Sequence, residues 1–189
     1  MSLTQPQPAD ACTPQHTPVG RGFESWLGYF HHANDYYNEG LPITSIGTLN
    51  VCDNRFTDLW DTSGPAVAQH TSGLYEEDLF TNRTLSVIAA HDASNVSAPL
   101  FLLHAFHLVH TPLQVPASAL ARFPDIDDKK RQLVAAMAGY LDDQVAKIVA
   151  ALKANTKMWD DTLLIFSADV SSPSFCFHSS ARKSLFVVS

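Results

Sequence analysis

Two polar residues follow the two most strand-like stretches of this sequence. An apolar run over residues 100–106 precedes His110, and a second run over residues 162–167 ends at Asp169. An imidazole can transfer a proton near neutral pH, and a carboxylate is a ligand for hard cations such as calcium. Functional groups of α/β proteins collect where the carboxyl ends of strands meet the loops. We therefore expect His110 and Asp169 at one edge of a shared sheet, where they could form a hydrolytic or metal site.

Each of the two residues also has an ordinary structural interpretation. A histidine ahead of a proline-rich loop is often only a hydrogen-bonded loop residue, as His110 could be. An aspartate at the end of a strand is commonly the N-cap of the next helix, as Asp169 could be. Spacing alone leaves both alternatives open.

Two further groups of histidines could take part in chemistry. His104, His107 and His110 follow one another at three-residue steps, which would gather them around a transition metal if they lay on a helix. In a strand, His104 and His110 share one face while His107 points to the other, so a common zinc ion is not expected.

The second group, His31, His32 and Asp35, lies among aromatic residues and could line a pocket for a sugar ring. Packed loop residues would give the same pattern. The sequence contains no GxSxG elbow, P-loop, HExxH motif or dinucleotide fingerprint.

A helix is predicted ahead of the first apolar run. Two residues that commonly cap helices, Thr71 and Ser72, precede an acidic first turn at residues 76–78. Apolar residues then recur at helical spacing, which predicts a helix over residues 73–90 with its apolar face inward and Asn82 outward.

A longer helix is predicted between the two apolar runs. Asp127 and Asp128 open a segment with one broad apolar stripe, as an amphipathic helix requires. The stripe consists of Leu133, Met137, Leu141, Val145, Ile148 and Leu152. The flanking apolar runs are typical of strands buried on both faces of a parallel sheet. Strand, helix and strand then form a βαβ unit, whose strands should run parallel with a right-handed connection.

The two ends of the chain differ in character from this unit. The first third, up to about Thr71, is rich in glycine, proline and aromatic residues without sustained periodicity, which indicates ordered loops pinned by aromatic side chains. Residues 170–189 form a serine-rich tail to which the pattern assigns no role. We expect an unstructured segment over residues 1–12, one α/β domain over residues 13–169 and a divergent tail over residues 170–189.

The composition fits a chain with a buried core and excludes several partners. Of its 189 residues, 46% are hydrophobic and 16% are charged, which is far from the composition of a disordered chain. The formal net charge of -7, without an extended basic run, argues against nucleic acid as a partner. No stretch reaches the roughly 20 apolar residues needed to span a bilayer.

Cysteines and processing signals give little further information. Cys12, Cys52 and Cys176 are an odd number at wide separations, which predicts neither a disulfide framework nor a CxxC site. Residues 1–11 lack an apolar core segment, so no signal peptide is expected and the compartment stays unassigned. Asn82 and Asn95 begin glycosylation-type sequons, which also arise often by chance.

Several stretches taken together resemble the sulfatase family, and most of all its arylsulfatase B-like branch. In chain order they are Thr17–Phe23, Leu27–Phe30, Asp35–Tyr37, Pro99–Leu102, Val109–Pro116 and Ile165–Asp169. The stretch Val109–Pro116, VHTPLQVP, is the most specific of them. The resemblance implies an α/β fold over residues 13–169. That fold would be a partial alkaline-phosphatase-like sandwich, with a mostly parallel sheet and flanking helices, missing its N-terminal strands.

The resemblance also implies an activity, the hydrolysis of aryl or sugar sulfate esters. In this family a cysteine in a C-x-P-S-R motif becomes formylglycine, whose hydrate attacks sulfur beside a bound calcium. His110 matches the family histidine that contacts the sulfate and is a candidate to protonate the leaving oxygen. Asp169 matches the first residue of an Asp-Asn-Gly-Gly motif, whose first two residues are calcium ligands. Family members are usually secreted or lysosomal glycoproteins.

The sequence departs from the family pattern at the nucleophile and at the metal site. It contains neither the C-x-P-S-R motif nor the N-terminal metal-binding aspartate pair, so the resemblance supplies no nucleophile. Val170 stands where the family has asparagine, and its side chain offers calcium no oxygen. Lys183 is a faint counterpart of the family's sulfate-binding lysine, and that role is not carried over. We therefore expect this chain to be inactive alone, the alternative being a non-catalytic module that binds sulfated glycans.

Overall fold

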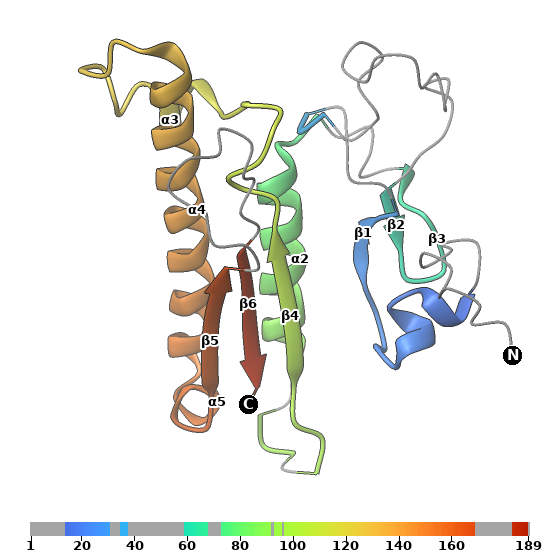
Figure 1. Ribbon diagram of the computed structural model, residues 1–189. Helices are drawn as coiled ribbons and strands as arrows, with labels where there is room; N and C mark the ends of the chain where they lie inside the picture. Colours follow the sequence, from blue (N-terminus) through green and yellow to red (C-terminus); the bar gives the residue numbers. More distant parts are fainter. Residues whose placement is uncertain are drawn as a thin grey trace, which may run out of the picture. The chain divides into compact units, whose positions relative to one another are not determined.

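The computed structural model describes residues 14–30, 35–37, 59–67, 73–91, 93–95, 97–168 and 183–188. The chain divides into two compact units, Met1–Gly73 and Leu74–Ser189, each of which is described by itself (Figure 1). The predicted boundaries at residues 12 and 169 stay predictions. Among the described residues, no helix is long and apolar enough to cross a membrane.

The first unit contains a small antiparallel sheet that the sequence pattern did not predict. Its strands are β1 (Leu27–Tyr29), β2 (Leu59–Asp61) and β3 (Gly64–Pro65), in the order β1-β2-β3. Two short 3-10 helices, η1 (Pro14–His16) and η2 (Val19–Arg21), precede it. The strands are too short for a periodic pattern to reveal, which is why the sequence indicated only loops.

Aromatic side chains hold this first unit together, as the composition predicted. The ring of Phe30 meets the rings of Trp26 and Trp60 edge to face, with centroid distances of 5.2 and 5.5 Å. Close backbone packing requires a glycine at position 20, because a Cβ there would lie 2.0 Å from the carbonyl oxygen of Pro14. Aromatic contacts and close backbone approach thus support the short strands and 3-10 helices of this unit.

The second unit contains a three-stranded sheet with its C-terminal strand in the middle. The strands are β4 (Phe101–Phe106), β5 (Leu163–Ala168) and β6 (Lys183–Val188), in the order β4-β6-β5. Both outer strands pair with β6 in an antiparallel sense, so β4 and β5 run parallel to each other, as predicted (Figure 1).

The expectation of a mostly parallel sheet is wrong for the described strands, because every hydrogen-bonded pair among them is antiparallel. The cause lies in residues 183–188, part of the tail to which the sequence pattern assigned no role. Their sequence, Lys-Ser-Leu-Phe-Val-Val, is rich in residues that favour strands, and they insert between β4 and β5.

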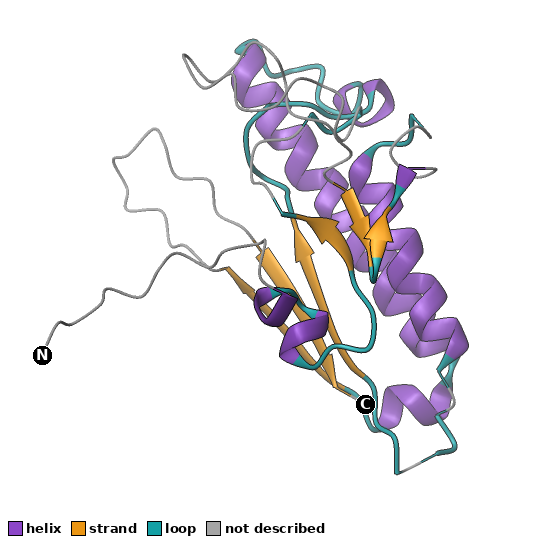
Figure 2. Cartoon of the chain, turned by 90° about the vertical axis from the view of Figure 1, so that its right-hand side faces the viewer, coloured by secondary structure: helices purple, strands orange, loops and turns teal. Residues whose placement is uncertain are grey.

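The prediction that β4 and β5 are buried on both faces is also wrong. Burial alternates along β4, with Leu102, His104 and Phe106 inside and Phe101 and Leu103 exposed. The side chains of β5 from residue 163 to 167 are exposed or half-buried. Figure 2 shows the reason, since helices α2 and α4 lie on one side of the sheet.

Both long helices form where the sequence predicted them. They are α2 (Glu76–Ala90) and α4 (Lys129–Ala154), accompanied by the short helices α3 (Ala117–Leu120) and α5 (Thr156–Asp160). Asn82 is exposed on α2, as expected. The centre of the predicted stripe on α4 is buried, at Met137, Leu141, Ile148 and Leu152.

The two helix starts differ in how they are capped. Asp128 caps α4, because its side chain accepts a hydrogen bond from the backbone N–H of Arg131 at 2.8 Å. Helix α2 begins later than predicted, at Glu76, and its N-cap residue Tyr75 makes no side-chain cap. The predicted caps at residues 71 and 72 lie outside the described residues.

Candidate active site

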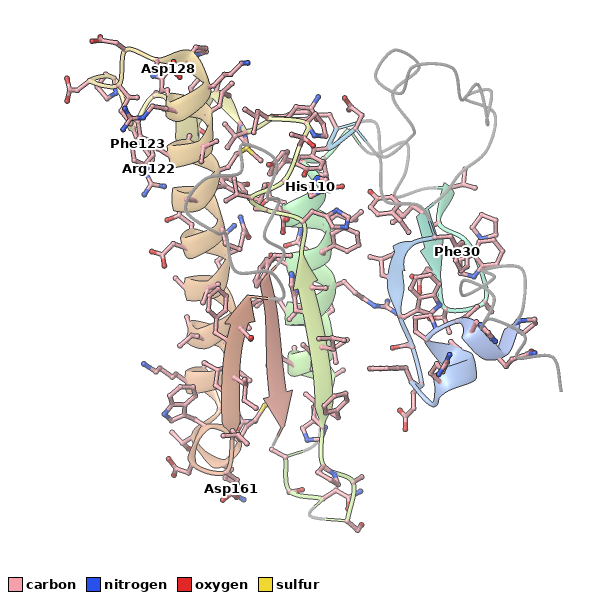
Figure 3. The ribbon with its side chains drawn as sticks, in the orientation of Figure 1. Phe30, His110, Arg122, Phe123, Asp128 and Asp161 are labelled. Atoms are coloured by element: carbon pink, nitrogen blue, oxygen red, sulfur yellow. The ribbon has the colours of Figure 1, made fainter. Side chains whose placement is uncertain are left out.

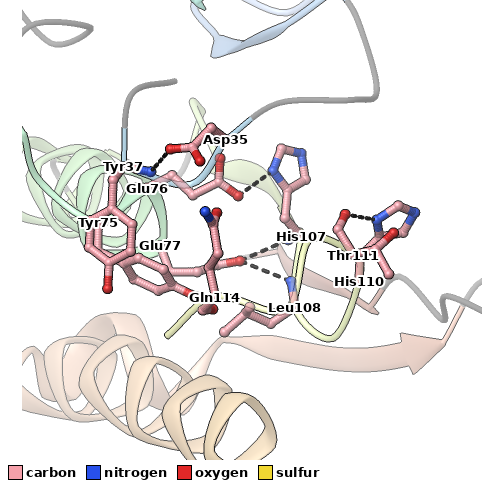
Figure 4. Close-up of polar contacts among 10 residues, drawn as sticks. All are labelled: Asp35, Tyr37, Tyr75, Glu76, Glu77, His107, Leu108, His110, Thr111 and Gln114. Carbon is pink, nitrogen blue, oxygen red and sulfur yellow. Dashed lines mark hydrogen bonds and ion pairs between the residues drawn. The ribbon is translucent and has the colours of Figure 1, made fainter. Parts of the chain in front are cut away.

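The loop that follows β4 carries His110 and lies against the start of helix α2 (Figures 3 and 4). Three consecutive residues of α2 and its N-cap, Tyr75, Glu76 and Glu77, contact this loop. They hold it both before and after His110, so the position of the imidazole depends on the N-terminus of α2.

Glu77 binds the beginning of the loop. Its Oε1 accepts hydrogen bonds from the backbone N–H groups of His107 at 2.9 Å and Leu108 at 3.0 Å (Figure 4). The glutamate side chain is fully buried. Burial, and after it the charge of Glu76, raises the pKa of the Glu77 carboxyl from 4.5 to about 7. The His107 charge and the two backbone hydrogen bonds act in the opposite direction.

Glu76 binds the side chain of the same loop residue. Its Oε1 lies 2.7 Å from Nδ1 of His107, an ion pair when the imidazole is protonated. The His107 ring also meets the ring of Phe80, on the next turn of α2, edge to face at a centroid distance of 5.7 Å. His107 is therefore directed toward α2, the helix that His104 also contacts, so the expectation that His104 and His107 point in opposite directions is wrong.

Tyr75 binds the far side of the loop. Its hydroxyl donates a hydrogen bond to the backbone carbonyl of Gln114 at 2.8 Å. Within the loop, the N–H of Gln114 donates to the carbonyl of Pro112 at 2.9 Å, which forms a tight turn. Tyr75 and Glu77, at one end of α2, thus bind the loop at both of its ends, from residue 107 to residue 114.

The imidazole of His110 has a defined proton arrangement. Its Nδ1 lies 2.5 Å from the backbone carbonyl oxygen of Thr111 (Figure 4). A carbonyl oxygen only accepts, so Nδ1 carries the proton, and in the neutral ring Nε2 is the basic nitrogen. The residue is half-buried, which suits a group that exchanges a proton with a bound molecule.

The two strands that precede the predicted site positions end at the same edge of the sheet. Phe106, the last residue of β4, and Ala168, the last residue of β5, both stand opposite Lys183. Because neighbouring strands lie about 4.8 Å apart, these two strand ends are about 10 Å from each other. Asp169 itself lies outside the described residues, as do His31, His32 and the three cysteines.

His104 and His110 do not share a site with His107. His104 is buried on β4, and its Nδ1 lies 2.7 Å from the hydroxyl of Thr84 on α2. Burial, and after it the charge of His107, lowers the pKa of His104 from 6.5 to about 4. In the part of the chain that the structure describes, no three His, Cys, Asp or Glu side chains gather as a metal site.

Sequence reasoning missed Tyr75 and Glu77, the residues that hold the loop. The acidic residues at the start of α2 did not indicate a contact with the loop, because an acidic first turn is common in solvent-exposed helices. Two adjacent glutamates ahead of a strongly apolar segment carried no sign of their burial, which depends on a loop thirty residues away. The Asp35 carboxylate, also a sequence candidate, accepts a hydrogen bond from the N–H of Tyr37 at 3.0 Å and so forms a local turn.

Comparison with known proteins gives a family match and curated relatives that share most of this chain. The family model described as Sulfatase matches residues 4–175. Arylsulfatase J of Mus musculus is 29% identical over 152 residues, which cover 80% of this chain and 23% of that protein. The chain therefore spans less than a quarter of the length of this relative.

Among the solved structures that are similar in fold are two of Ps i-CgsB. The structure described as Ps i-CgsB in complex with k-i-k-neocarrahexaose has a TM-score of 0.68 and 24% identity, covering 92% of this chain and 41% of that chain. Ps i-CgsB by itself has a TM-score of 0.64 and 21% identity, with the same coverage. These similarities confirm the predicted α/β fold and extend over less than half of the solved chains.

Proposed function

This chain belongs to the sulfatase family, and we therefore propose that it contributes to the hydrolysis of sulfate esters. In this proposal His110 contacts the sulfate group and donates a proton to the leaving oxygen. The observation that supports it is the hydrogen bond from Nδ1 to the carbonyl of Thr111, which leaves Nε2 as the nitrogen that binds and releases a proton.

The attacking group of this reaction is not supplied by the chain. Its 189 residues contain no C-x-P-S-R motif from which formylglycine could form. A covalent mechanism without its nucleophile loses the step on which turnover depends. We expect the chain to bind a sulfate group at His110 and to be inactive alone.

Sulfatases are known as a family for metal use, and we propose Asp169 as a calcium ligand of this chain. The donor set does not form a complete site, since Val170 follows Asp169 and the described residues hold no cluster of three acidic or imidazole ligands. Calcium requires six to eight oxygen ligands, so one carboxylate would bind it weakly. We derive no catalytic step through the metal.

Sulfate esters of sugars or aryl groups are the proposed substrates. One curated relative is named an arylsulfatase, and one structural neighbour was solved with an oligosaccharide. In such an ester the oxygen that joins the ring to the sulfur is the leaving oxygen. This oxygen needs a proton when it leaves, and His110 would supply it. Nothing in the acidic composition favours nucleic acid as an alternative partner.

The test of the proposal combines an activity assay with a binding measurement. The purified chain is incubated with an aryl sulfate and calcium, and release of the phenol is expected to stay at background. Inorganic sulfate is then titrated while the His110 ring signals are followed by NMR, with the ring assigned from a His110→Gln variant. Saturable shifts of His110 support the proposal, whereas turnover above background contradicts the inactive state of this chain.

A second candidate function, recognition of sulfated glycans without hydrolysis, is favoured by the missing nucleophile together with the oligosaccharide bound to a structural neighbour. Unlike the first candidate, it requires both the sugar and the sulfate group for tight binding. A sulfated oligosaccharide should then bind more tightly than inorganic sulfate, and the same sugar without sulfate should bind weakly. Equal binding of sulfate and sulfated sugar would remove this candidate.

A further inference from the structure

Two adjacent glutamates, Glu76 and Glu77, are fully buried at the start of α2. Glutamate is almost never fully buried unless it is paired. Glu76 has such a partner in the His107 imidazole. Glu77 has none of opposite charge in direct contact among the described residues, and its Oε2 accepts no hydrogen bond there. A carboxyl that is this costly to bury breaks a general rule of protein cores, and such exceptions concentrate at functional sites.

Oε1 of Glu77 accepts hydrogen bonds from an unusual pair of donors. Both are backbone N–H groups, of His107 and Leu108, and these are the first two residues after β4. A carboxylate that accepts from two consecutive amides fixes the direction in which the chain leaves the strand, since the two N–H groups must converge on one point. Only Val109 separates Leu108 from His110.

We infer that Glu77 is a positioning residue for His110, which holds the imidazole at the sheet edge by fixing the backbone of His107 and Leu108. This role rests on the proposed function, in which His110 binds the sulfate group. Glu77 lies on α2 and does not touch the reacting atoms, so it acts only through the loop.

The other contacts of the loop do not replace this role. The side chain of Leu108 is buried and helps to anchor the loop, but an apolar contact does not fix the direction of the backbone. Glu76 binds the ring of His107, whereas the backbone N–H of His107 donates to Glu77. Tyr75 binds the loop beyond His110, at the carbonyl of Gln114. Glu77 is thus the contact through which α2 sets the path of the chain into His110.

The matched variants are Glu77→Ala, Glu77→Gln and Glu76→Gln, each made in the full chain. Alanine removes the acceptor, whereas glutamine keeps one oxygen that can accept from both N–H groups. Glu76→Gln changes the neighbouring buried carboxyl, which binds the ring of His107, and serves as the control. Amide hydrogen exchange at His107 and Leu108 and sulfate titration at His110 are measured for each variant by NMR.

The inference predicts a distinct order among the variants. Glu77→Ala should speed exchange at His107 and Leu108 by about tenfold or more and weaken sulfate binding at His110 by a similar factor. Glu77→Gln should restore both to within about threefold of the parent chain, because a neutral acceptor still binds both amides. Glu76→Gln should leave exchange at Leu108 near the parent value.

The outcomes separate this inference from the proposed function. Sulfate binding that is equal in the parent and in Glu77→Ala, with unchanged exchange at Leu108, overturns the inference and leaves the proposed function standing. If the parent chain binds no sulfate, the proposed function fails. Exchange and the ring shifts of His110 then still decide whether Glu77 positions the loop, since neither requires a ligand.

A pH series keeps the inference testable if Glu77→Ala does not fold. Opening of the loop lets water reach the Glu77 carboxyl, whose pKa is about 7 when buried and 4.5 in the ordinary state. Protection of His107 and Leu108, corrected for intrinsic exchange, should therefore fall as pH rises from 4.5 to 7. The charged groups that act on Glu77 are Glu76 on α2 and His107 in the loop, and His107 in turn acts on His104 of β4.

The slope must vanish in Glu77→Gln and persist in Glu76→Gln. A slope that persists in Glu77→Gln belongs to one of the imidazoles and overturns the inference.

Discussion

His104 and Glu77 are buried ionisable groups whose pKa values shift in opposite directions for one physical reason. Burial penalises whichever form carries charge, so it raises the pKa of the Glu77 acid to about 7 and lowers that of the His104 base to about 4. Folding thus favours the uncharged form of both side chains. The two residues take part in different contacts of α2. His104 of β4 contacts Thr84 of α2, whereas Glu77 of α2 contacts the loop after β4.

The two shifts act on stability with opposite signs. Between pH 4.5 and 7 the folded chain binds more protons at Glu77 than the unfolded chain, so this term lowers the free energy of unfolding as pH rises. Between pH 4 and 6.5 the unfolded chain binds more protons at His104, so this term is fully present above pH 6.5 and is lost as pH falls. In the shared range the two terms oppose each other.

Single substitutions should therefore tilt the pH dependence of stability in opposite directions. Glu77→Gln leaves the His104 term alone, and the free energy of unfolding should fall more steeply between pH 7 and 5 than in the parent. His104→Gln leaves the Glu77 term alone, and stability should rise over the same change. Urea unfolding at pH 7 and pH 5 measures both.

The exposed residue His16 provides the control for exchanging an imidazole for an amide. His16→Gln should leave the urea midpoints close to the parent values, as surface substitutions usually do. Equal tilts in Glu77→Gln and His104→Gln would contradict the assignment of the two terms.

At the scale of elements, Asp78 joins helix α2 to helix α4. Its carboxylate accepts from the hydroxyl of Tyr140 at 2.5 Å and from Nε2 of Gln144 at 3.1 Å, and it pairs with Nζ of Lys147 at 3.3 Å. The Tyr140 ring also meets the ring of Tyr75 edge to face at 5.2 Å. Since Tyr75 binds the far side of the loop, the long helix α4 supports the candidate site through this contact.

The three partners of Asp78 should contribute unequally. Tyr140→Phe keeps the ring and removes a hydrogen bond to a charged acceptor, which should cost about 1 to 2 kcal/mol of unfolding free energy. Lys147→Ala removes an ion pair whose cation is half exposed, which should cost less than about 1 kcal/mol. Urea unfolding at neutral pH compares them. A larger loss in Lys147→Ala than in Tyr140→Phe would contradict this ranking.

The helices could be predicted from the sequence, whereas the partners of the strands could not. The periodicity of α4 is local, and its burial follows from one stripe of side chains. Strand pairing depends on residues far apart in the chain, and nothing within residues 100–106 or 162–167 indicates that residues 183–188 lie between them. The predicted burial of both sheet faces failed for the same reason, because coverage of a face is set by other elements.

Within the candidate site, too, some residues could be predicted from the sequence and others could not. His110 was found through a sequence resemblance, and the parallel direction of β4 and β5 through the helix that connects them. Glu77 could not be found, because its role depends on a contact with backbone atoms of His107 and Leu108, and backbone atoms leave no trace in residue identity. Asp169 remains a prediction outside the described residues.

At the scale of the whole molecule, the sheet of the second unit presents an apolar face. Residues Phe101 and Leu103 of β4 are 53% and 41% exposed, and Leu163 and Ile165 of β5 are 60% and 44% exposed. The register puts position 101 in line with 163 and position 103 in line with 165 across β6, so all four share one face. The outer strands β4 and β5 also each have one edge without a partner strand among the described residues.

Exposed apolar faces and open strand edges both favour association, so we expect the isolated chain to self-associate and to be poorly soluble. The double variant Leu103→Thr with Ile165→Thr keeps β-branched or strand-compatible side chains while it removes apolar surface from the centre of this face. It should shift the sedimentation profile toward monomer at equal concentration.

Val134 offers a matched control, since it is 42% exposed and belongs to helix α4, not to a strand of the sheet. Val134→Thr removes a similar apolar surface from a helix and should leave the association unchanged. If the parent chain sediments as a single monomeric species, the apolar face does not drive association. If Val134→Thr is as effective as the double variant, general surface hydrophobicity is the cause, and the aligned rows of β4 and β5 have no special part in it.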